Sequence, residues 1–249
     1  MPAIKLKKAP LKEAIFEVFW QLPLDMTNFP TDPDFDLALG KFQDILSNEF
    51  PVNKSLEIAG NSFRIFPKPS WQFWKGELEW PVIQLGHGIL AVNDTDKNYI
   101  WENTYRPNIV IAINALLKAY KRQPKFNRSK LTYINAIEYN PQEQTPLQFV
   151  SENLKTTIHT EYNVPGLENN LLLNRAFDMN EIGLVQINIQ NGINNANMRP
   201  SIIWTIAVER STNFTTREEI LDWVDRAHTF THDFFVKMLK PEFYESFER

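Results

Sequence analysis

The residues best suited to metal chemistry are Asp225, His228 and His232, close to the C-terminal end of the chain. Spacings of three and four residues put all three on one side of a helix. Two imidazoles and a carboxylate are a workable ligand set for zinc or iron. His228 also falls at the edge of an apolar arc, where a histidine usually packs its ring and hydrogen-bonds. The cluster predicts either a metal site or a histidine at the margin of the core.

Glu13 and Glu17 form a second pair with possible chemistry, because they share one face of a predicted strand. Two carboxylates can perform acid–base catalysis if burial separates their pKa values. Carboxylates that face solvent or pair with lysine and arginine are much commoner on strands. The pattern favours this second interpretation.

An aromatic cluster lies near the middle of the first half of the chain: Trp71, Phe73, Trp74 and Trp80, with Lys68 and Lys75 close by. Aromatics next to cations can stack nucleic-acid bases. They can equally fill a core, or anchor a peptide or protein at an interface. Core packing is the favoured interpretation, and an interface comes next.

Composition excludes several kinds of site. The chain has 249 residues, a net charge of −4 and no cysteine, so disulfides, thiolate metal sites and cysteine nucleophiles are ruled out. With only eight glycines and no G-x-S-x-G motif, it lacks phosphate-binding loops and a hydrolase elbow. Gly86 and Gly88 flank His87 between two strand-like runs and predict a hairpin or bulge.

No apolar run approaches the roughly 18 residues that a membrane span needs. Charges at Lys12, Glu13 and Glu17 interrupt the apolar residues near the N-terminus, where a signal peptide would need an uninterrupted core. We therefore expect a cytoplasmic protein without a membrane partner, and no cofactor is indicated.

Periodicity predicts the elements of the first half. Residues 13–20 alternate as a strand, and Asp32 with Pro33 starts a helix that Pro51 ends. The remaining predicted elements are strands at Ser62–Phe66, Trp71–Trp74 and Val82–Asn93, and a helix from Pro107 to Tyr120.

The second half repeats this order. Thr145 caps a helix from Pro146 to Ile158, with Gln148 completing a capping box, and Thr215 with Glu218 opens a last helix that runs to about Leu239. The predicted strands are Leu131–Tyr139, Leu171–Phe177, Leu184–Ile189 and Ile202–Val208, with an Asn-rich turn at Asn191–Asn197. We expect the last helix to turn one stripe inward: Ile220, Val224, Ala227, Phe234 and Met238.

Clustered strands favour an α+β fold with a mainly antiparallel sheet and a long C-terminal helix. The repeated order predicts two strand–helix–strands–helix halves, residues 1–124 and 125–249, packed as one compact unit. Gln123–Lys130 is polar, basic and broken by Pro124, so it is the predicted boundary between them.

Three segments resemble a sporadically distributed prokaryotic family of unknown function, whose members are about this long. They are Lys8–Glu17, the stretch from Gln84 to Glu102, and a final helix with Ala227-His228 followed by Phe234-Phe235. The resemblance covers nearly the whole chain. It implies a complete domain but no activity, and the patchy distribution of the family suggests accessory genes such as those of defence systems.

Positions that match the family pattern gain interest as binding residues: Glu13, Asn93, Tyr99, Trp101, Glu102 and His228. The repeated order also resembles the tandem repeat of TATA-binding-protein-like folds, which is an analogy of fold alone. The acidic balance of this chain departs from what a DNA-binding saddle needs.

These observations predict a non-enzymatic protein-interaction module whose partner is another protein or a second copy of itself. The expected binding residues are Glu13, Trp71, Trp74, Asn93, Tyr99, Trp101 and Glu102. One alternative is a nucleic-acid-associated protein that uses the basic segments Met1–Lys12 and Lys118–Lys130. The other is a metal-dependent enzyme centred on Asp225, His228 and His232.

Overall fold

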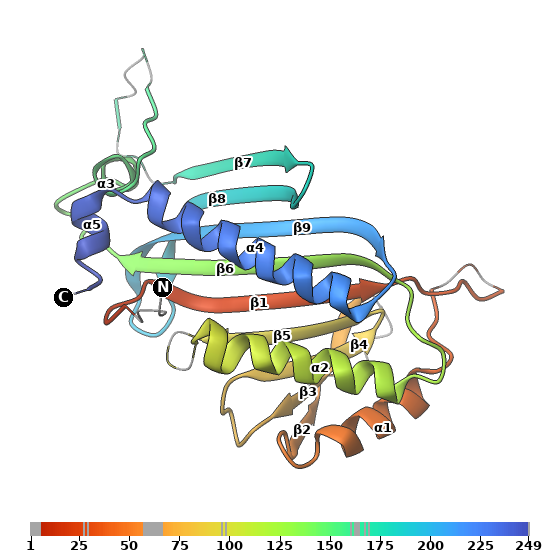
Figure 1. The fold of residues 1–249 in the computed structure, drawn as a ribbon. Coiled ribbons are helices and arrows are strands. Elements are labelled where there is room, and N and C mark those ends of the chain that lie inside the picture. Colours follow the sequence, from red (N-terminus) through yellow and green to blue (C-terminus); the bar gives the residue numbers. More distant parts are fainter. Residues whose placement is uncertain are drawn as a thin grey trace.

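The computed structural model shows a mixed α and β protein built on one large antiparallel sheet (Figure 1). The structure describes residues 6–26, 28, 30–56, 67–95, 97, 99–159, 161, 165, 166, 168 and 170–248. Within these residues, no helix has the length and apolar character that crossing a membrane would take.

In the part of the chain that the structure describes, nine strands form the sheet in the order β2-β3-β4-β5-β1-β6-β9-β8-β7, and every neighbouring pair is antiparallel. In chain order the strands are β1 (Leu11–Trp20), β2 (Val52–Ser55), β3 (Lys68–Trp74), β4 (Val82–His87), β5 (Ile89–Thr95), β6 (Phe126–Glu138), β7 (Leu172–Met179), β8 (Gly183–Asn194) and β9 (Arg199–Phe214).

The helices lie on one face of this sheet, with α1, α2 and α4 along it and α3 and α5 together at one end (Figure 1). Their bounds are α1 (Phe35–Leu46), α2 (Arg106–Ala119), α3 (Pro146–Asn153), α4 (Arg217–Met238) and α5 (Pro241–Glu245). A single π-helical turn, η1 (Trp101–Tyr105), leads directly into α2. We call the opposite side of the sheet the helix-free face.

The two central strands, β1 and β6, each begin a run of elements. After β1 come α1, four strands and α2, and after β6 come α3, three strands and α4. The last strand of each run pairs back onto its first, β5 on β1 and β9 on β6. All nine strands thereby join one continuous sheet.

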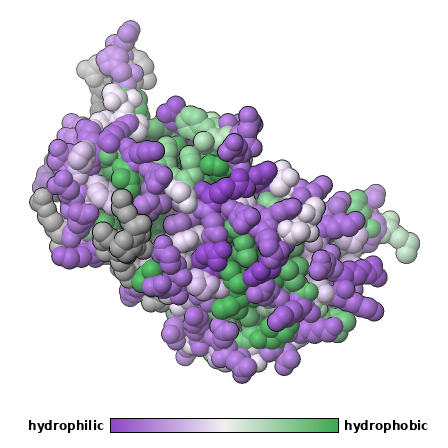
Figure 2. All heavy atoms as spheres, in the orientation of Figure 1, coloured by the Kyte–Doolittle hydropathy of each residue, from purple (hydrophilic) through white to green (hydrophobic). Residues whose placement is uncertain are grey.

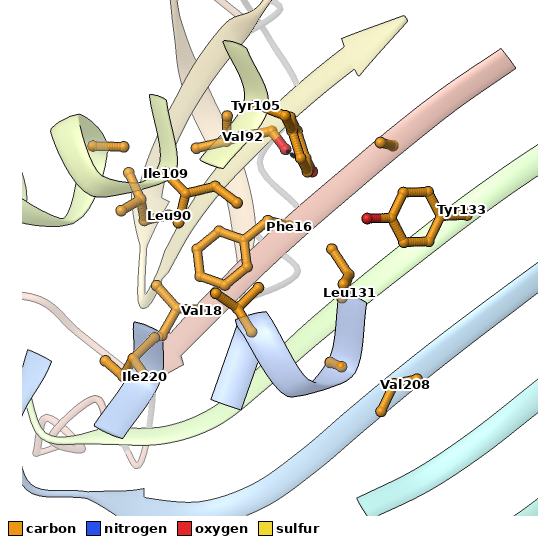
Figure 3. Packing of buried hydrophobic residues seen from close by; sticks show 14 of the residues in the cluster. Phe16, Val18, Leu90, Val92, Tyr105, Ile109, Leu131, Tyr133, Val208 and Ile220 are labelled. Atoms are coloured by element: carbon orange, nitrogen blue, oxygen red, sulfur yellow. Dashed lines mark hydrogen bonds between the residues drawn. The ribbon is translucent and has the colours of Figure 1, made fainter. Parts of the chain in front are cut away.

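The core lies between the sheet and its helices. Ala14, Phe16 and Val18 alternate along β1 and are fully buried, because their side chains share the face that α2 and α4 cover. Phe16 lies among apolar residues of neighbouring strands and helices in Figure 3, which include Leu90, Ile109 and Leu131. Burial of these side chains is the main favourable contribution to folding.

The predicted mixed fold, antiparallel sheet and long C-terminal helix are confirmed. The capping box of α3 is also present, since Thr145 and Gln148 satisfy each other's backbone N–H groups. Four residues of the predicted inward stripe of α4 are buried, while Phe234 is only partly so. The predicted strand Ser62–Phe66 lies outside the described residues.

Several boundaries differ from the predictions. The hairpin predicted at Gly86–Gly88 is present, and it divides the predicted strand Val82–Asn93 into β4 and β5, since Gly88 takes a positive φ of 77° that permits a tight turn. The helix α3 stops at Asn153, and Leu154 forms a β-bridge with Leu239 instead. The N-cap of α4 is Thr216, whose hydroxyl accepts from Glu219, one position later than predicted.

The strand predicted at Leu131–Tyr139 starts earlier than expected, because β6 begins at Phe126, within the segment Gln123–Lys130. Arg128 and Lys130 lie on the helix-free face, where Lys130 is directly opposite Glu17 and Glu209 on the adjacent strands. The basic side chains are thus accommodated by a polar face of the central sheet. Because these residues are charged, the hydrophobic periodicity did not predict this part of the strand.

Candidate functional site

A buried polar cluster connects η1 with α4 on the helix side of the sheet. The indole of Trp101 stacks on the imidazole of His228, with ring centroids 3.8 Å apart and an interplanar angle of 8°. The Tyr133 hydroxyl lies 2.9 Å from His228 Nδ1, and the Tyr99 hydroxyl lies 2.9 Å from that of Tyr133. Three residues that the sequence singled out therefore meet here: Tyr99, Trp101 and His228.

The protonation of this cluster follows from its burial. The pKa of His228 is lowered to about 4, mainly by burial and also by the nearby His232, while Asp225 partly opposes the shift. The same loss of solvent raises the pKa values of Tyr99, Tyr105 and Tyr133. At neutral pH the histidine is neutral and the tyrosines keep their protons. If the neutral imidazole carries its proton on Nε2, Tyr133 donates to His228 Nδ1 and its hydroxyl oxygen can accept from Tyr99.

Arg106 and Asp225 make a second connection between α2 and α4. Arg106 Nε and Nη2 donate to the two carboxylate oxygens of Asp225, each over 2.7 Å. Such a bidentate pair fixes geometry more strongly than a single ion pair does. Its side chains are each 37% exposed, so solvent screening keeps its contribution to stability small.

The predicted metal ligands are therefore engaged in other contacts. Asp225 is held by Arg106, His228 by Trp101 and Tyr133, and His232 lies 3.5 Å from Asp233. Among the described residues, no three His, Cys, Asp or Glu side chains are grouped so that they could hold a metal ion. Metal binding by this trio stays a prediction, and it would require Asp225 to leave Arg106.

Glu13 and Asn93 lie on the helix-free face, away from this cluster. The Asn93 amide donates to Glu13 Oε1 over 2.7 Å, while its own Oδ1 is buried and makes no hydrogen bond. Glu17 is on the same face, and burial raises its pKa although Lys130 and Arg128 act in the opposite direction. Glu13 with Asn93 is thus a polar contact between β1 and β5.

The remaining predicted residues do not come together. Phe73 is buried on the helix side against Phe42, whereas Trp74, the next residue, packs edge-on to Trp80 on the other face. Trp71 is partly buried against the core, and Glu102 is exposed in η1. The aromatic cluster is therefore divided between the two faces of β3.

The basic segments are partly neutralised. Arg122 lies 3.9 Å from Asp34, and Arg128 lies 3.7 Å from Glu209 with its guanidinium over the ring of Phe19. Residues 1–5 of the other segment lie outside the described residues. Nucleic-acid binding stays a prediction.

The two edge strands, β2 and β7, are the least covered elements of the sheet, and all four residues of β2 are exposed. Every residue of β7 is exposed except Leu173, which is half-buried. The opposite edge, β2, has four residues, follows Pro51 and carries Lys54. Short length, proline and charged residues, lysine above all, are the usual protection of an edge strand, whereas β7 has eight residues, neither proline nor lysine, and only Arg175 and Asp178 as charged residues.

Backbone hydrogen bonding determines which groups of β7 face outward. The Asn191 amide donates to the Leu171 carbonyl over 3.3 Å, next to the β7–β8 ladder. Because hydrogen-bonded pairs alternate in antiparallel sheets, Leu173, Arg175 and Phe177 point their backbone groups toward β8. The even-numbered residues point theirs away from the sheet: Leu172, Asn174, Ala176 and Asp178.

Apolar side chains accompany this edge. Phe177 and Met179 share the helix-side face of β7 and are 38% and 36% exposed. Figure 2 shows hydrophobic surface over β7 and β8, beside α4. A hollow of about 370 Å³ adjoins α4 here and is lined by Glu181, Ile182, Asp225, Arg226, Thr229 and Phe230.

Sequence reasoning predicted the strand of β7 but not its place at the edge of the sheet, and it missed Tyr133 as a partner of His228 and Arg106 as a partner of Asp225. Tyr133 was part of a predicted strand, but nothing in a strand pattern indicates which distant side chains it will meet. An edge strand and an interior strand can have the same local pattern, so pairing order had to come from the structure. Comparisons of the chain with protein-family models, curated proteins and solved structures find no match.

Proposed function

We propose that this protein is a non-enzymatic protein-interaction module, and that its binding surface is the β7 edge with the apolar residues beside it. The observation that carries this proposal is a long edge strand whose outward backbone groups and helix-side apolar residues are left exposed. An edge strand of this kind binds a partner by adding another strand to the sheet.

The chemistry of the buried cluster supports a structural role for it. A general base for neutral pH needs a pKa near 7, whereas the pKa of His228 is lowered to about 4. Tyr99, Tyr133 and His228 also use one another as hydrogen-bond partners, and Trp101 covers one face of the imidazole. We interpret this cluster as the connection that holds α2 and α4 in place.

We further propose that residues 1–124 and 125–249 are two pseudo-symmetric halves that share the sheet as a rigid scaffold. The supporting observation is the order of elements on either side of the β1–β6 pair. Membership of the prokaryotic family that the sequence resembles, and a role in an accessory system, belong to the same proposal.

The test is a capture experiment from the native host with three versions of the full chain. Ala176→Pro removes an outward N–H of β7 and leaves the bonds to β8 intact. Asn53→Pro is the matched control on β2, since Leu56 donates to Ser70 and odd-numbered residues of β2 therefore face outward.

A partner captured by the wild type and by Asn53→Pro, but not by Ala176→Pro, is the expected result. Cross-linking with mass spectrometry should then map that partner, or a second copy of the chain, to residues of β7. Partners that bind all three versions equally, or no partner above background, would overturn the proposal.

A further inference from the structure

We infer that the partner of the β7 edge is a second copy of this chain, paired antiparallel through β7 about a two-fold axis at Ala176. The inference rests on the proposed function and specifies the partner. It follows from the direction of the backbone groups and from the complementarity of the strand with itself.

The symmetry restricts the pairing. Two neighbouring antiparallel strands of identical chains are related by a two-fold axis perpendicular to the sheet, so some residue must lie opposite itself. Ala176 points its N–H and C=O outward, and so do Asn174 and Asp178 on either side of it. With Ala176 on the axis, each of these pairs can exchange two backbone hydrogen bonds with the second copy.

Side chains on both faces agree with this register. On the helix-free face, Asn174 lies opposite Asp178 of the second copy, which matches an amide donor with a carboxylate. On the helix-side face, Arg175 lies opposite Phe177 of the second copy. Within one chain, the Arg175 guanidinium already lies 4.8 Å from the Phe177 ring centroid, so this cation–π contact would be continued between the copies.

The apolar residues also find partners. Leu173 lies opposite Met179 of the second copy. Because the two-fold axis is perpendicular to the sheet, the helix-side faces of both copies lie on the same side of the joined sheet. The two copies of α4 then border one trough above the junction, where Phe177 and Met179 of both chains would lose solvent. Their present exposure of more than a third is what pairing would remove.

Neighbouring registers are less favourable. An axis at Arg175 would place two guanidinium groups opposite each other, and an axis at Asp178 would do the same with two carboxylates. An axis at Asn174 would pair fewer residues of β7 and leave Asp178 beyond the strand of the second copy. Ala176 combines the longest overlap with no like-charge contact.

Mass measurement by analytical ultracentrifugation tests the inference on the full chain. We expect the wild type and Asn53→Pro to sediment as dimers at micromolar concentration. Ala176→Pro, which lacks the N–H at the axis, should sediment as a monomer. Ala176→Lys should do so as well, because it places two ammonium groups opposite each other on an exposed position and leaves the fold of each chain intact.

The register can be tested separately because the chain has no cysteine. Ala176→Cys should form a disulfide between copies on mild oxidation, since directly opposite residues lie about 5.5 Å apart between Cα atoms, within disulfide range. Leu172→Cys should not, because in this register the two copies of residue 172 are many residues apart. Asn53→Cys is the control for random collision at an exposed edge.

A wild-type chain that stays monomeric over the whole concentration range would overturn the inference. So would a dimer that survives both Ala176→Pro and Ala176→Lys, or one that Leu172→Cys cross-links as efficiently as Ala176→Cys does. If the chain is monomeric but Ala176→Pro still abolishes capture of a different host protein, the proposed function stands and only the identity of the partner changes.

Discussion

The helices α1 and α3 follow the two central strands in the same way, yet they lie in different places. Twelve-residue α1 packs along α2 and places Phe42 against Phe73 of β3. Eight-residue α3 stays at the end of the sheet, where Phe149 packs edge-on to Phe243 of α5. The outer side of α2 is therefore covered, and the corresponding side of α4 is left bare next to β7 (Figure 1).

The two edges of the sheet also differ in length and composition. The edge near α1 ends in β2, which is short and carries Lys54, whereas the edge beyond α4 ends in the longer β7. A helix packed on a sheet buries apolar surface and stabilises the fold, whereas an uncovered part of the sheet stays accessible to a partner. Under the proposed function, the flank that α1 covers stabilises the fold and the flank at β7 binds the partner.

The largest expected effect is a difference in unfolding free energy between substitutions on the two flanks. Phe42→Ala should lower the free energy of unfolding by about 3–5 kcal/mol, because the fully buried ring leaves a cavity between α1 and β3. Phe177→Ala, at a position 38% exposed on β7, should change it by only about 0.5 kcal/mol in the monomer. Urea unfolding of both variants in the Ala176→Lys background, which keeps the chains apart, measures the difference. Equal losses would contradict the comparison.

The second prediction concerns pH and the inner side of α4. Because the pKa of His228 is lowered to about 4 in the fold, the unfolded chain binds more protons than the folded one between about pH 4 and 6.5. Stability from this group is complete above the unfolded pKa and is lost as pH falls through this range. We expect a loss of roughly 2–3 kcal/mol relative to His228→Phe, which has no titrating group there.

Urea unfolding at several pH values measures this loss as a difference between wild type and variant, so that contributions of other groups such as Glu17 cancel. His159→Gln, at an exposed position after α3, is the matched control and should follow the wild-type profile. A wild-type profile parallel to that of His228→Phe would show that the imidazole is not desolvated in the folded chain.

A third, smaller effect is expected at Tyr133. Replacing it with Phe removes the hydroxyl between Tyr99 and His228 and leaves both without this partner. The expected loss is about 1–3 kcal/mol of unfolding free energy, the usual penalty for orphaned buried polar groups. Tyr244→Phe, on α5 and outside this chain of hydrogen bonds, should have little effect in the same thermal or urea unfolding measurement. Similar losses in the two variants would argue against a connecting role for the cluster.

The smallest effect is expected at α3, the helix at the end of the sheet. Thr145→Ala removes the capping box of α3 and should cost about 1 kcal/mol. Since α3 lies at the end of the sheet, we expect faster amide hydrogen exchange confined to α3 and little change elsewhere. Thr216→Ala at the N-cap of α4 is the comparison, and its effect should reach the amides of the neighbouring strands β6 and β9. Exchange that spreads equally in both variants would mean that α3 is as integral as α4.

Much of the local structure could be predicted from the sequence. Proline in the first turn marked the start of α2, proline after the capping Thr145 marked that of α3, and alternation marked β1, β3 and β9. These signals are local, because a cap or a period of two depends on residues a few positions apart. The start of β6 was predicted wrongly for the same reason. Its basic residues are locally typical of a linker, and only the structure shows that Glu17 and Glu209 lie opposite Lys130.

The sequence by itself predicted most of the helices and strands in their order, but not β2 or α5, and it determined the apolar stripe of α4 and the absence of cysteine chemistry. Only the tertiary structure decided that Trp101 stacks on His228, that Arg106 pairs with Asp225, and that β7 is an edge strand with no helix packed over it among the described residues. These contacts join residues more than a hundred positions apart or depend on the order of strands in the sheet. Local pattern carries no information on such pairing, because it arises from how whole elements pack to bury apolar surface.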